Sequence, residues 1–247
     1  MAFKNRIGEK YITNEGYEIQ IIKYFNAKNC TIMFKDGQEI DNISFHQVKT
    51  GQIKNKEKFS VFGVGYLGKG YYKAGSYKYN TWIGILRRCY DFKYQERQPT
   101  YRDSLVIKEW HNFQNFAQWF EENYNPEIME GWALDKDILL KGNKIYSPET
   151  CCFVPQEINN LFTKRQNKRG NNPIGVYLEK GTNKFKSQIN INKKKINLGR
   201  FNSPEEAFQA YKITKEQYIK QLADKWKDQI DPRVYQALYN YTVEITD

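Results

Sequence analysis

Polar and apolar side chains alternate one by one between Lys184 and Ile191. The polar members are Lys184, Lys186, Gln188 and Asn190, and the residues between them are Phe185, Ser187, Ile189 and Ile191. Successive side chains of a strand point to opposite faces, so a period of two predicts a half-buried strand with one polar face.

The residues that follow predict a turn and a return strand. Asn192 and the lysine run 193–195 (KKK) have the composition of a turn. Ile196 and Leu198 then resume the apolar face of the next strand. Gly199 indicates a β-bulge or a close backbone approach.

A long amphipathic helix is predicted after this pair of strands. Ser203 suits the N-cap, Pro204 suits the first helical position, and Glu206 completes a capping box. The apolar residues at helical spacing are Phe208, Tyr211, Tyr218, Leu222 and Trp226. We therefore expect a three-stranded antiparallel sheet with this helix across one face. The expected core consists of Phe185, Ile189, Leu198, Phe208 and Tyr211.

The other face of this sheet is expected to be basic. Between Lys164 and Arg200 there are eleven Lys and Arg residues and one acid, Glu179, so this segment carries most of the net charge of +11. Lysine and arginine neutralise phosphates, and amide side chains can hydrogen-bond to base edges. The pattern therefore predicts a DNA-binding surface, and a solvated basic sheet face is the alternative.

The segment GVY…KFKSQI…KKINLGRFNSPEEAFQAY resembles the ethylene-response-factor (APETALA-type) DNA-binding domain, over roughly Pro173 to Lys225. The resemblance implies a three-stranded sheet that enters the major groove of double-stranded DNA. The residues that this resemblance and the sheet pattern together place on DNA are Lys184, Lys186, Gln188, Asn190, Lys193, Lys194, Lys195 and Arg200. The chain lacks some arginines and tryptophans of plant members, so a particular target sequence does not carry over.

Residues 1–56 predict a small β domain. Strands are expected over Tyr17–Tyr24, Cys30–Lys35 and Ile43–Val48, with turn residues after the first two. Three or four strands in this length suit a curled barrel of SH3-like size. His46 has no second titratable group near it in the sequence, so a catalytic role is not expected.

Two helices with aromatic stripes are predicted in the central region, residues 57–169. The first stripe is Trp82, Ile85, Leu86 and Cys89, and the second is Trp110, Phe113, Phe116, Ala117 and Phe120. Stripes at this spacing are typical of core packing. His111 accompanies the second stripe and is either structural or a site residue.

The stretch from Trp132 to Phe162 predicts strand, turn, strand and the start of a helix. The segments YNTW…RRCY, EW-x-x-F-x-x-F, LDKDIL and YSPETC-x-FVP resemble the ββα core of HNH endonucleases, in the form that accompanies an APETALA-type module in bacteriophage proteins. This resemblance extends from about Phe59 to Arg169. It implies a homing-endonuclease-like protein that works in the cytoplasm of a bacterial host.

The resemblance places catalysis around Asp135. An HNH enzyme has a histidine general base after this aspartate, and this chain has Lys136 there instead. His111 is the other candidate base. Asp135, Asp137 and Asn159 supply the hard oxygen ligands that suit Mg²⁺, which is the cofactor expected if the centre is catalytic.

Residues 163–172 (TKRQNKRGNN) predict a basic linker before the third domain, 170–247. Its cations would follow DNA phosphates: Lys164, Arg165, Lys168 and Arg169. A last helix is expected after Asp231-Pro232. The expected fold class is therefore α+β: a small N-terminal β unit, a central HNH-like ββα unit with preceding helices, and the C-terminal sheet and helix.

The remaining features narrow the class of protein. Cys30, Cys89, Cys151 and Cys152 lack CxxC spacing and are expected to be free thiols. The sequence contains no membrane span and no secretory leader, so no membrane partner is expected. Three interpretations stay open: a double-stranded DNA-binding protein with a degenerate nuclease centre, an active Mg²⁺-dependent HNH endonuclease, and a phage inhibitor that binds a host protein or nucleoprotein complex.

Overall fold

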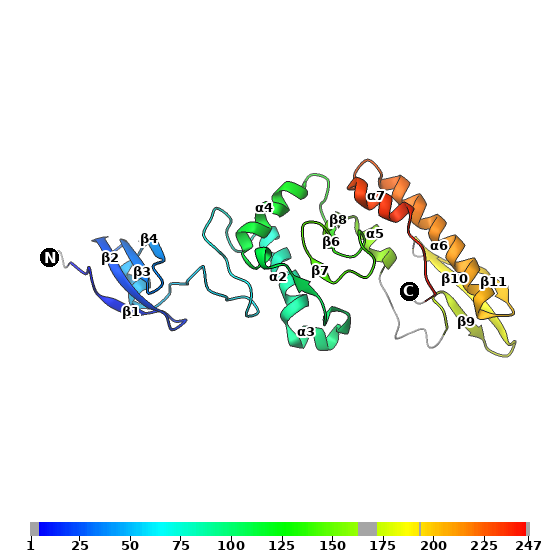
Figure 1. The fold of residues 1–247 in the computed structure, drawn as a ribbon, viewed down its shortest axis with the longest axis horizontal. Coiled ribbons are helices and arrows are strands. Elements are labelled where there is room, and N and C mark those ends of the chain that lie inside the picture. The colour runs from blue at the N-terminus through cyan, green and yellow to red at the C-terminus, as the bar shows by residue number, and fades with distance from the viewer. Residues whose placement is uncertain (1–4, 163–171, 193, 246–247) are drawn as a thin grey trace. The chain divides into compact units, whose positions relative to one another are not determined.

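The computed structural model describes residues 5–162, 172–192 and 194–245, and it has the expected α+β composition. The chain divides into two compact units (Figure 1). The first consists of residues 1–74 with 112–114, and the second consists of residues 75–111 with 115–247. No helix among the described residues is both long and apolar enough to cross a lipid bilayer.

The first unit is built on a four-stranded antiparallel meander. Its strands, in spatial order, are β1 (Lys10–Ile12), β2 (Glu18–Asn26), β3 (Asn29–Phe34) and β4 (Glu39–Ile43). Its buried core consists of Ile19, Ile21, Cys30, Ile32, Phe34, Val48 and Ile53. The short helix α1 (Phe45–Lys49) adds Val48 to that core.

The predicted strand over Ile43–Val48 is wrong. The structure ends β4 at Ile43 and begins α1 at Phe45. Ser44 is the N-cap: its hydroxyl accepts a hydrogen bond from the Gln47 backbone N–H, and the Gln47 side chain accepts one from the Ser44 backbone N–H. This capping box satisfies two backbone donors at the helix start, which favours a helical turn over continued strand.

The helices of the second unit bury the predicted stripes. The stripes lie on α2 (Tyr77–Tyr90) and α4 (Phe113–Asn123), and the first two residues of α4 are grouped with the first unit. Trp110 of the second stripe precedes α4, and the short helix α3 (Phe92–Arg97) has no buried residue. Trp82, Ile85, Leu86 and Cys89 of α2 are buried, as predicted. The Trp82 indole N–H donates to the Trp110 carbonyl at 2.7 Å, and this bond satisfies a buried polar group.

Short strands frame the polar part of this unit. β6 (Ala133–Asp135) pairs antiparallel with β8 (Cys152–Val154), and β5 (Leu105–Val106) pairs parallel with β7 (Ile145–Tyr146). α5 (Gln156–Asn159) follows β8 directly, so the predicted order of strand, turn, strand and helix is confirmed. Short 3₁₀ helices span Pro99–Tyr101, Lys108–His111 and Asn160–Phe162. All four cysteines are free thiols, as predicted.

The C-terminal part of the second unit is a sheet covered by a helix. Its strands β9 (Val176–Glu179), β10 (Lys184–Ile191) and β11 (Lys194–Phe201) are antiparallel, with β10 in the middle. α6 (Pro204–Trp226) contacts all three strands, and α7 (Pro232–Tyr239) packs against α6. Figure 1 shows α6 running along the sheet.

The predicted small core forms between sheet and helix. Ile189, Phe208 and Tyr211 are buried, and Phe185 and Leu198 are half-buried. Gly175 leads into β9 with φ +76°, and a Cβ atom there would lie 2.1 Å from the Tyr211 ring. Only glycine therefore fits between the start of the sheet and the helix.

The predicted bulge near Gly199 is confirmed. Ser187 pairs with Gly199 and Gln188 pairs with Asn197, so Leu198 is the extra residue of β11. Gly199 adopts φ +132°, which disfavours a residue with a side chain. The expectation that Ile196 lies in the apolar face is only partly met, because its side chain is 40% exposed near the end of the sheet.

Candidate nucleic-acid interface and central cavity

The strand register assembles a polar surface on the sheet face that α6 does not cover. Lys186 pairs with both Tyr177 and Arg200, and Asn190 pairs with Lys195. Residues paired directly across a sheet share a face. We define the open face as Tyr177, Glu179, Lys184, Lys186, Gln188, Asn190, Lys195, Asn197 and Arg200. Val176, Ser187 and Ile189 point the other way and are buried.

Six of the predicted DNA contacts lie together on the open face: Lys184, Lys186, Gln188, Asn190, Lys195 and Arg200. Lys194 pairs with Ile191, so it lies at the start of β11 outside this set. The remaining predicted contacts lie outside the described residues: Lys164, Arg165, Lys168, Arg169 and Lys193. Sequence reasoning missed Tyr177, Glu179 and Asn197, because their membership follows from the register of three strands.

Side chains on the open face differ in how firmly they are held. Arg200 forms an ion pair with Glu179, with Nε 2.7 Å from Oε2. The Lys195 ammonium lies 5.8 Å from the centre of the Tyr177 ring, and Lys184 donates to the side-chain oxygen of Asn202. Within the described part of the chain, Lys186 forms no hydrogen bond or ion pair. It is therefore the cation of this face that is most available to a phosphate.

Two buried polar atoms of the open face lack an internal partner. Among the described residues, neither the Tyr177 hydroxyl nor Gln188 Oε1 has a hydrogen bond. A buried polar atom without a partner costs free energy. A ligand or an ordered water molecule that supplied a donor to Gln188 would remove that cost.

The second candidate site is a cavity of about 400 Å³ in the second unit. α2 contributes Asn80, Thr81 and Arg88 to its lining, and α5 contributes Gln156 and Asn159. The segment that begins in β6 contributes Asp135, Lys136 and Asp137. The structure therefore brings the predicted metal ligands Asp135, Asp137 and Asn159 to one cavity.

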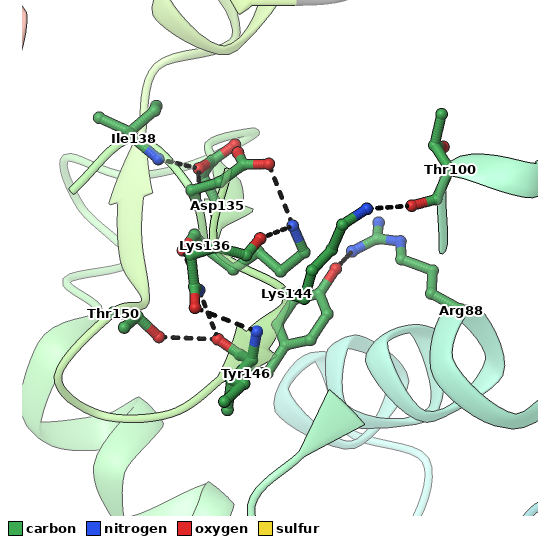
Figure 2. A network of polar contacts seen from close by, with 11 residues as sticks. Arg88, Thr100, Asp135, Lys136, Ile138, Lys144, Tyr146 and Thr150 are labelled. Atoms are coloured by element: carbon green, nitrogen blue, oxygen red, sulfur yellow. Dashed lines mark hydrogen bonds and ion pairs between the residues drawn. The ribbon is translucent and has the colours of Figure 1, made fainter. Parts of the chain in front are cut away.

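Lys136 is buried, and its ammonium group is held by neighbours from this segment (Figure 2). Its Nζ atom donates to Asp137 Oδ2 at 3.0 Å and to the Asn143 carbonyl at 2.8 Å. The ammonium also lies 5.8 Å from the centre of the Tyr146 ring. A lysine with these partners stabilises negative charge, and a protonated amine cannot take a proton from water.

Asp135 has one carboxylate oxygen committed to the backbone. Asp135 Oδ1 accepts hydrogen bonds from the backbone N–H groups of Asp137 and Ile138, both at 2.8 Å (Figure 2). Burial, together with the neighbouring Asp137 carboxylate, raises the pKa of Asp135 to about 6. The charged form of Asp135 is therefore disfavoured in this site. A cation bound beside Asp135 would balance that negative charge and favour the ionised carboxylate.

Arg88 was not predicted as a site residue, although it stands in the RRCY segment. Its Nη1 atom donates to the Tyr146 hydroxyl at 3.5 Å, and its guanidinium lies 5.8 Å from the Tyr101 ring centre. Figure 2 shows Arg88 directed toward Tyr146 from α2. No pattern in the sequence between Arg88 and Asp135 predicts that these two residues line the same cavity.

His111 lies elsewhere in the second unit and is not among the residues that line the cavity. Its Nε2 atom lies 3.2 Å from the Val106 carbonyl and 3.4 Å from the Tyr90 hydroxyl. A carbonyl only accepts, so Nε2 carries the proton in that bond. Only Nδ1 is then free to act as a base.

The residues around the cavity are suited in type to a divalent cation. Two carboxylates and one amide oxygen are ligands that Mg²⁺ accepts, and burial with the neighbouring Asp137 carboxylate disfavours the charged form of Asp135 when no cation is bound. Asp137 is already paired with Lys136. Within the described part of the chain, no group of three or more His, Cys, Asp or Glu side chains is arranged to hold a metal ion. Any ion would therefore also depend on Asn159 and water.

The chain was compared with protein families, curated proteins and solved structures. No protein-family model matches the chain, and neither a curated protein nor a solved structure matches it. The chemistry of these two sites is therefore the basis on which a function can be inferred.

Proposed function

We propose that this protein binds double-stranded DNA through the open face of its C-terminal sheet. The observation that supports this best is the register, which puts Lys184, Lys186, Lys195 and Arg200 on the sheet face opposite α6. Gln188, Asn190 and Asn197 lie between these cations. A surface of this composition can neutralise phosphates and also hydrogen-bond to base edges in a major groove.

The test uses the full chain and a fluorescently labelled duplex. Anisotropy titrations at several KCl concentrations give the dependence of affinity on salt. If the three lysines contact phosphates, the slope of log K against log[KCl] is about −3. An affinity for duplex DNA that does not change with salt, or no affinity at all, would sink the proposal. Capture of a host protein by the chain without nucleic acid would then favour the inhibitor interpretation.

The second candidate function is metal-dependent cleavage of DNA. The observation that favours it is the shared cavity of Asp135, Asp137 and Asn159, which Arg88 also lines. These three residues would hold Mg²⁺, which would supply charge stabilisation at a phosphate. The buried, paired Lys136 argues against it, because it stands where an HNH enzyme has its histidine and no histidine lines this cavity among the described residues.

A plasmid assay separates the two functions. Supercoiled plasmid is incubated with the full chain and Mg²⁺ or Mn²⁺, with EDTA as the blank. Our leading proposal expects binding without nicking. Nicking that Asp135→Asn abolishes would establish the second function. If the wild type nicks the plasmid, a nicking rate roughly 10²–10⁴ lower in His111→Ala would identify His111 as the general base.

A further inference from the structure

One ion pair on the open face joins the two outer strands. Arg200 lies on β11 and Glu179 lies on β9, and β10 runs between them. The pair therefore spans the central strand, near the end of the sheet where β9 ends and β10 begins. Lys186, which pairs in register with Arg200, has no such partner among the described residues.

The pair uses only one edge of the guanidinium group. Nε lies 2.7 Å from Glu179 Oε2, and Nη2 donates to Glu179 Oε1 at 2.8 Å. A guanidinium has five N–H donors in a planar fork. The carboxylate takes one N–H from Nε and one from Nη2. The edge formed by Nη1 and the second Nη2 hydrogen keeps its donors.

Glu179 is itself fixed from a second side. The Thr182 hydroxyl donates to Glu179 Oε2 at 3.2 Å, and the hydrogen bond from Arg200 is the main reason that the pKa of Glu179 is lowered. The Glu179 side chain is 22% exposed, whereas that of Arg200 is 60% exposed. The carboxylate is therefore the sheltered partner, and the arginine is the partner presented to solvent.

We propose that Arg200 reads a guanine base and that Glu179 is its positioning residue. Guanine presents O6 and N7 in the major groove, and two N–H groups on one edge of an arginine bind both acceptors together. The free edge of Arg200 offers that pair of donors, and the bond to Glu179 removes the freedom of the side chain to turn toward a phosphate. This inference rests on the proposed DNA binding and adds a base preference to it.

The competing explanation is an ordinary surface ion pair, which contributes little to stability or binding. In that case Glu179 would only reduce the attraction of the open face for phosphates. The two explanations differ in what the loss of Glu179 does: a repelling carboxylate affects all sequences equally, whereas a positioning carboxylate affects one base pair.

The experiment selects duplexes from a library with a randomised central segment, using the full chain. It compares the wild type with Arg200→Lys, Glu179→Gln and the control Lys186→Ala. Arg200→Lys keeps the charge and loses the planar fork, so the salt slope stays the same. The wild type should enrich a motif with a guanine at one fixed position. Arg200→Lys and Glu179→Gln should lower that preference about tenfold, within the range expected of a bidentate contact.

The control and the affinity measurements make the outcomes distinct. Lys186→Ala should weaken binding to every duplex and leave the motif unchanged. Glu179→Gln should bind unselected duplex at least as tightly as the wild type, because it removes a negative charge. An unchanged motif in Arg200→Lys or in Glu179→Gln would overturn the inference and leave DNA binding intact. Absence of binding by the wild type would instead overturn the proposed function. Because neither side chain is buried in the core, circular dichroism of each variant is expected to match the wild type.

Discussion

The open face and the central cavity both place cations beside carboxylates, but they differ in what those charges can still do. In the cavity, Lys136 is buried and its ammonium is bonded to a carboxylate and a carbonyl. On the open face, Arg200 is 60% exposed and keeps free donors after its ion pair forms. The comparison teaches that the presence of a charged residue is a weaker guide to function than its uncommitted donors.

The largest expected effect concerns the packing of α6 on the sheet, which covers one face and leaves the open face exposed. Phe208→Ala removes a buried aromatic ring from the core under the sheet. We expect a loss of about 3–5 kcal/mol in the free energy of unfolding, measured by urea denaturation. DNA affinity should fall with it. Leu178→Ala is the matched control, because Leu178 is 52% exposed in the same sheet. Equal stability of the two variants would contradict the packing of this core.

The second prediction concerns the cavity and pH. Asp135 has a folded-state pKa of about 6, raised by burial and by Asp137, above the ordinary value of 3.8. Below both values the carboxyl is protonated in both states. As pH rises, the unfolded chain ionises first, so the wild type loses stability up to and through pH 6. The loss is on the order of 2–3 kcal/mol.

Asp135→Asn should escape this loss, so its advantage over the wild type should grow between pH 4.5 and pH 7.5 in denaturant titrations. Asp103→Asn, at an exposed position, is the control and should show no such trend. Repeating the series with MgCl₂ sharpens the comparison. An ion held by Asp135 would stabilise the wild type selectively at the higher pH. If the stability difference between the wild type and Asp135→Asn does not change with pH, the pKa of Asp135 is not raised in the folded state.

A smaller effect is expected at the start of α6. The Ser203 hydroxyl accepts a hydrogen bond from the Glu206 backbone N–H at 3.2 Å. Ser203→Ala should lower the free energy of unfolding by about 1 kcal/mol, the usual contribution of such a cap. Ser203→Asn should restore most of it. A melting temperature that is the same for all three proteins would mean that solvent satisfies this end of the helix equally well.

The smallest prediction isolates one phosphate contact on the open face. Lys186→Ala should make the salt slope shallower by about one. Between 50 and 200 mM KCl, affinity would then fall about fourfold less than in the wild type. Lys108→Ala, at an exposed position in the central part of the second unit, is the control. An unchanged slope in Lys186→Ala would place that side chain away from the DNA.

Two capping motifs show how far the sequence predicts the fold. Ser203 precedes Pro204 and a clear helical stripe, and both the cap and the helix were predicted. The predicted capping box is only half formed, because the Glu206 carboxylate accepts from the Asn202 backbone N–H and not from that of Ser203. Ser44 and Gln47 make a complete capping box, but they stand within an apparent alternation from Ile43 to Val48. Local pattern alone favours a strand there. The helix forms because its caps are satisfied and Val48 enters the core.

The candidate sites were predictable to the extent that they follow from alternation along one strand. The cations of β10 were found in this way. The Arg200–Glu179 pair was not, because it depends on the register of three strands. The cavity likewise joins Arg88 of α2 to Asp135 through tertiary packing. The bond from Lys136 to the Asn143 carbonyl could not be predicted either, because it depends on the path of the turn between these residues.

The bulge in β11 has a consequence for self-association. Within the described residues β11 pairs only with β10, so its other side is an unpaired edge, and Ile196 is exposed there. An open edge with an apolar side chain can template the addition of a strand from a second molecule. Leu198 interrupts the regular spacing of backbone donors and acceptors, and Lys194 adds charge at one end. The same irregular strand that presents Arg200 is therefore a poorer template for strand addition than a regular edge would be.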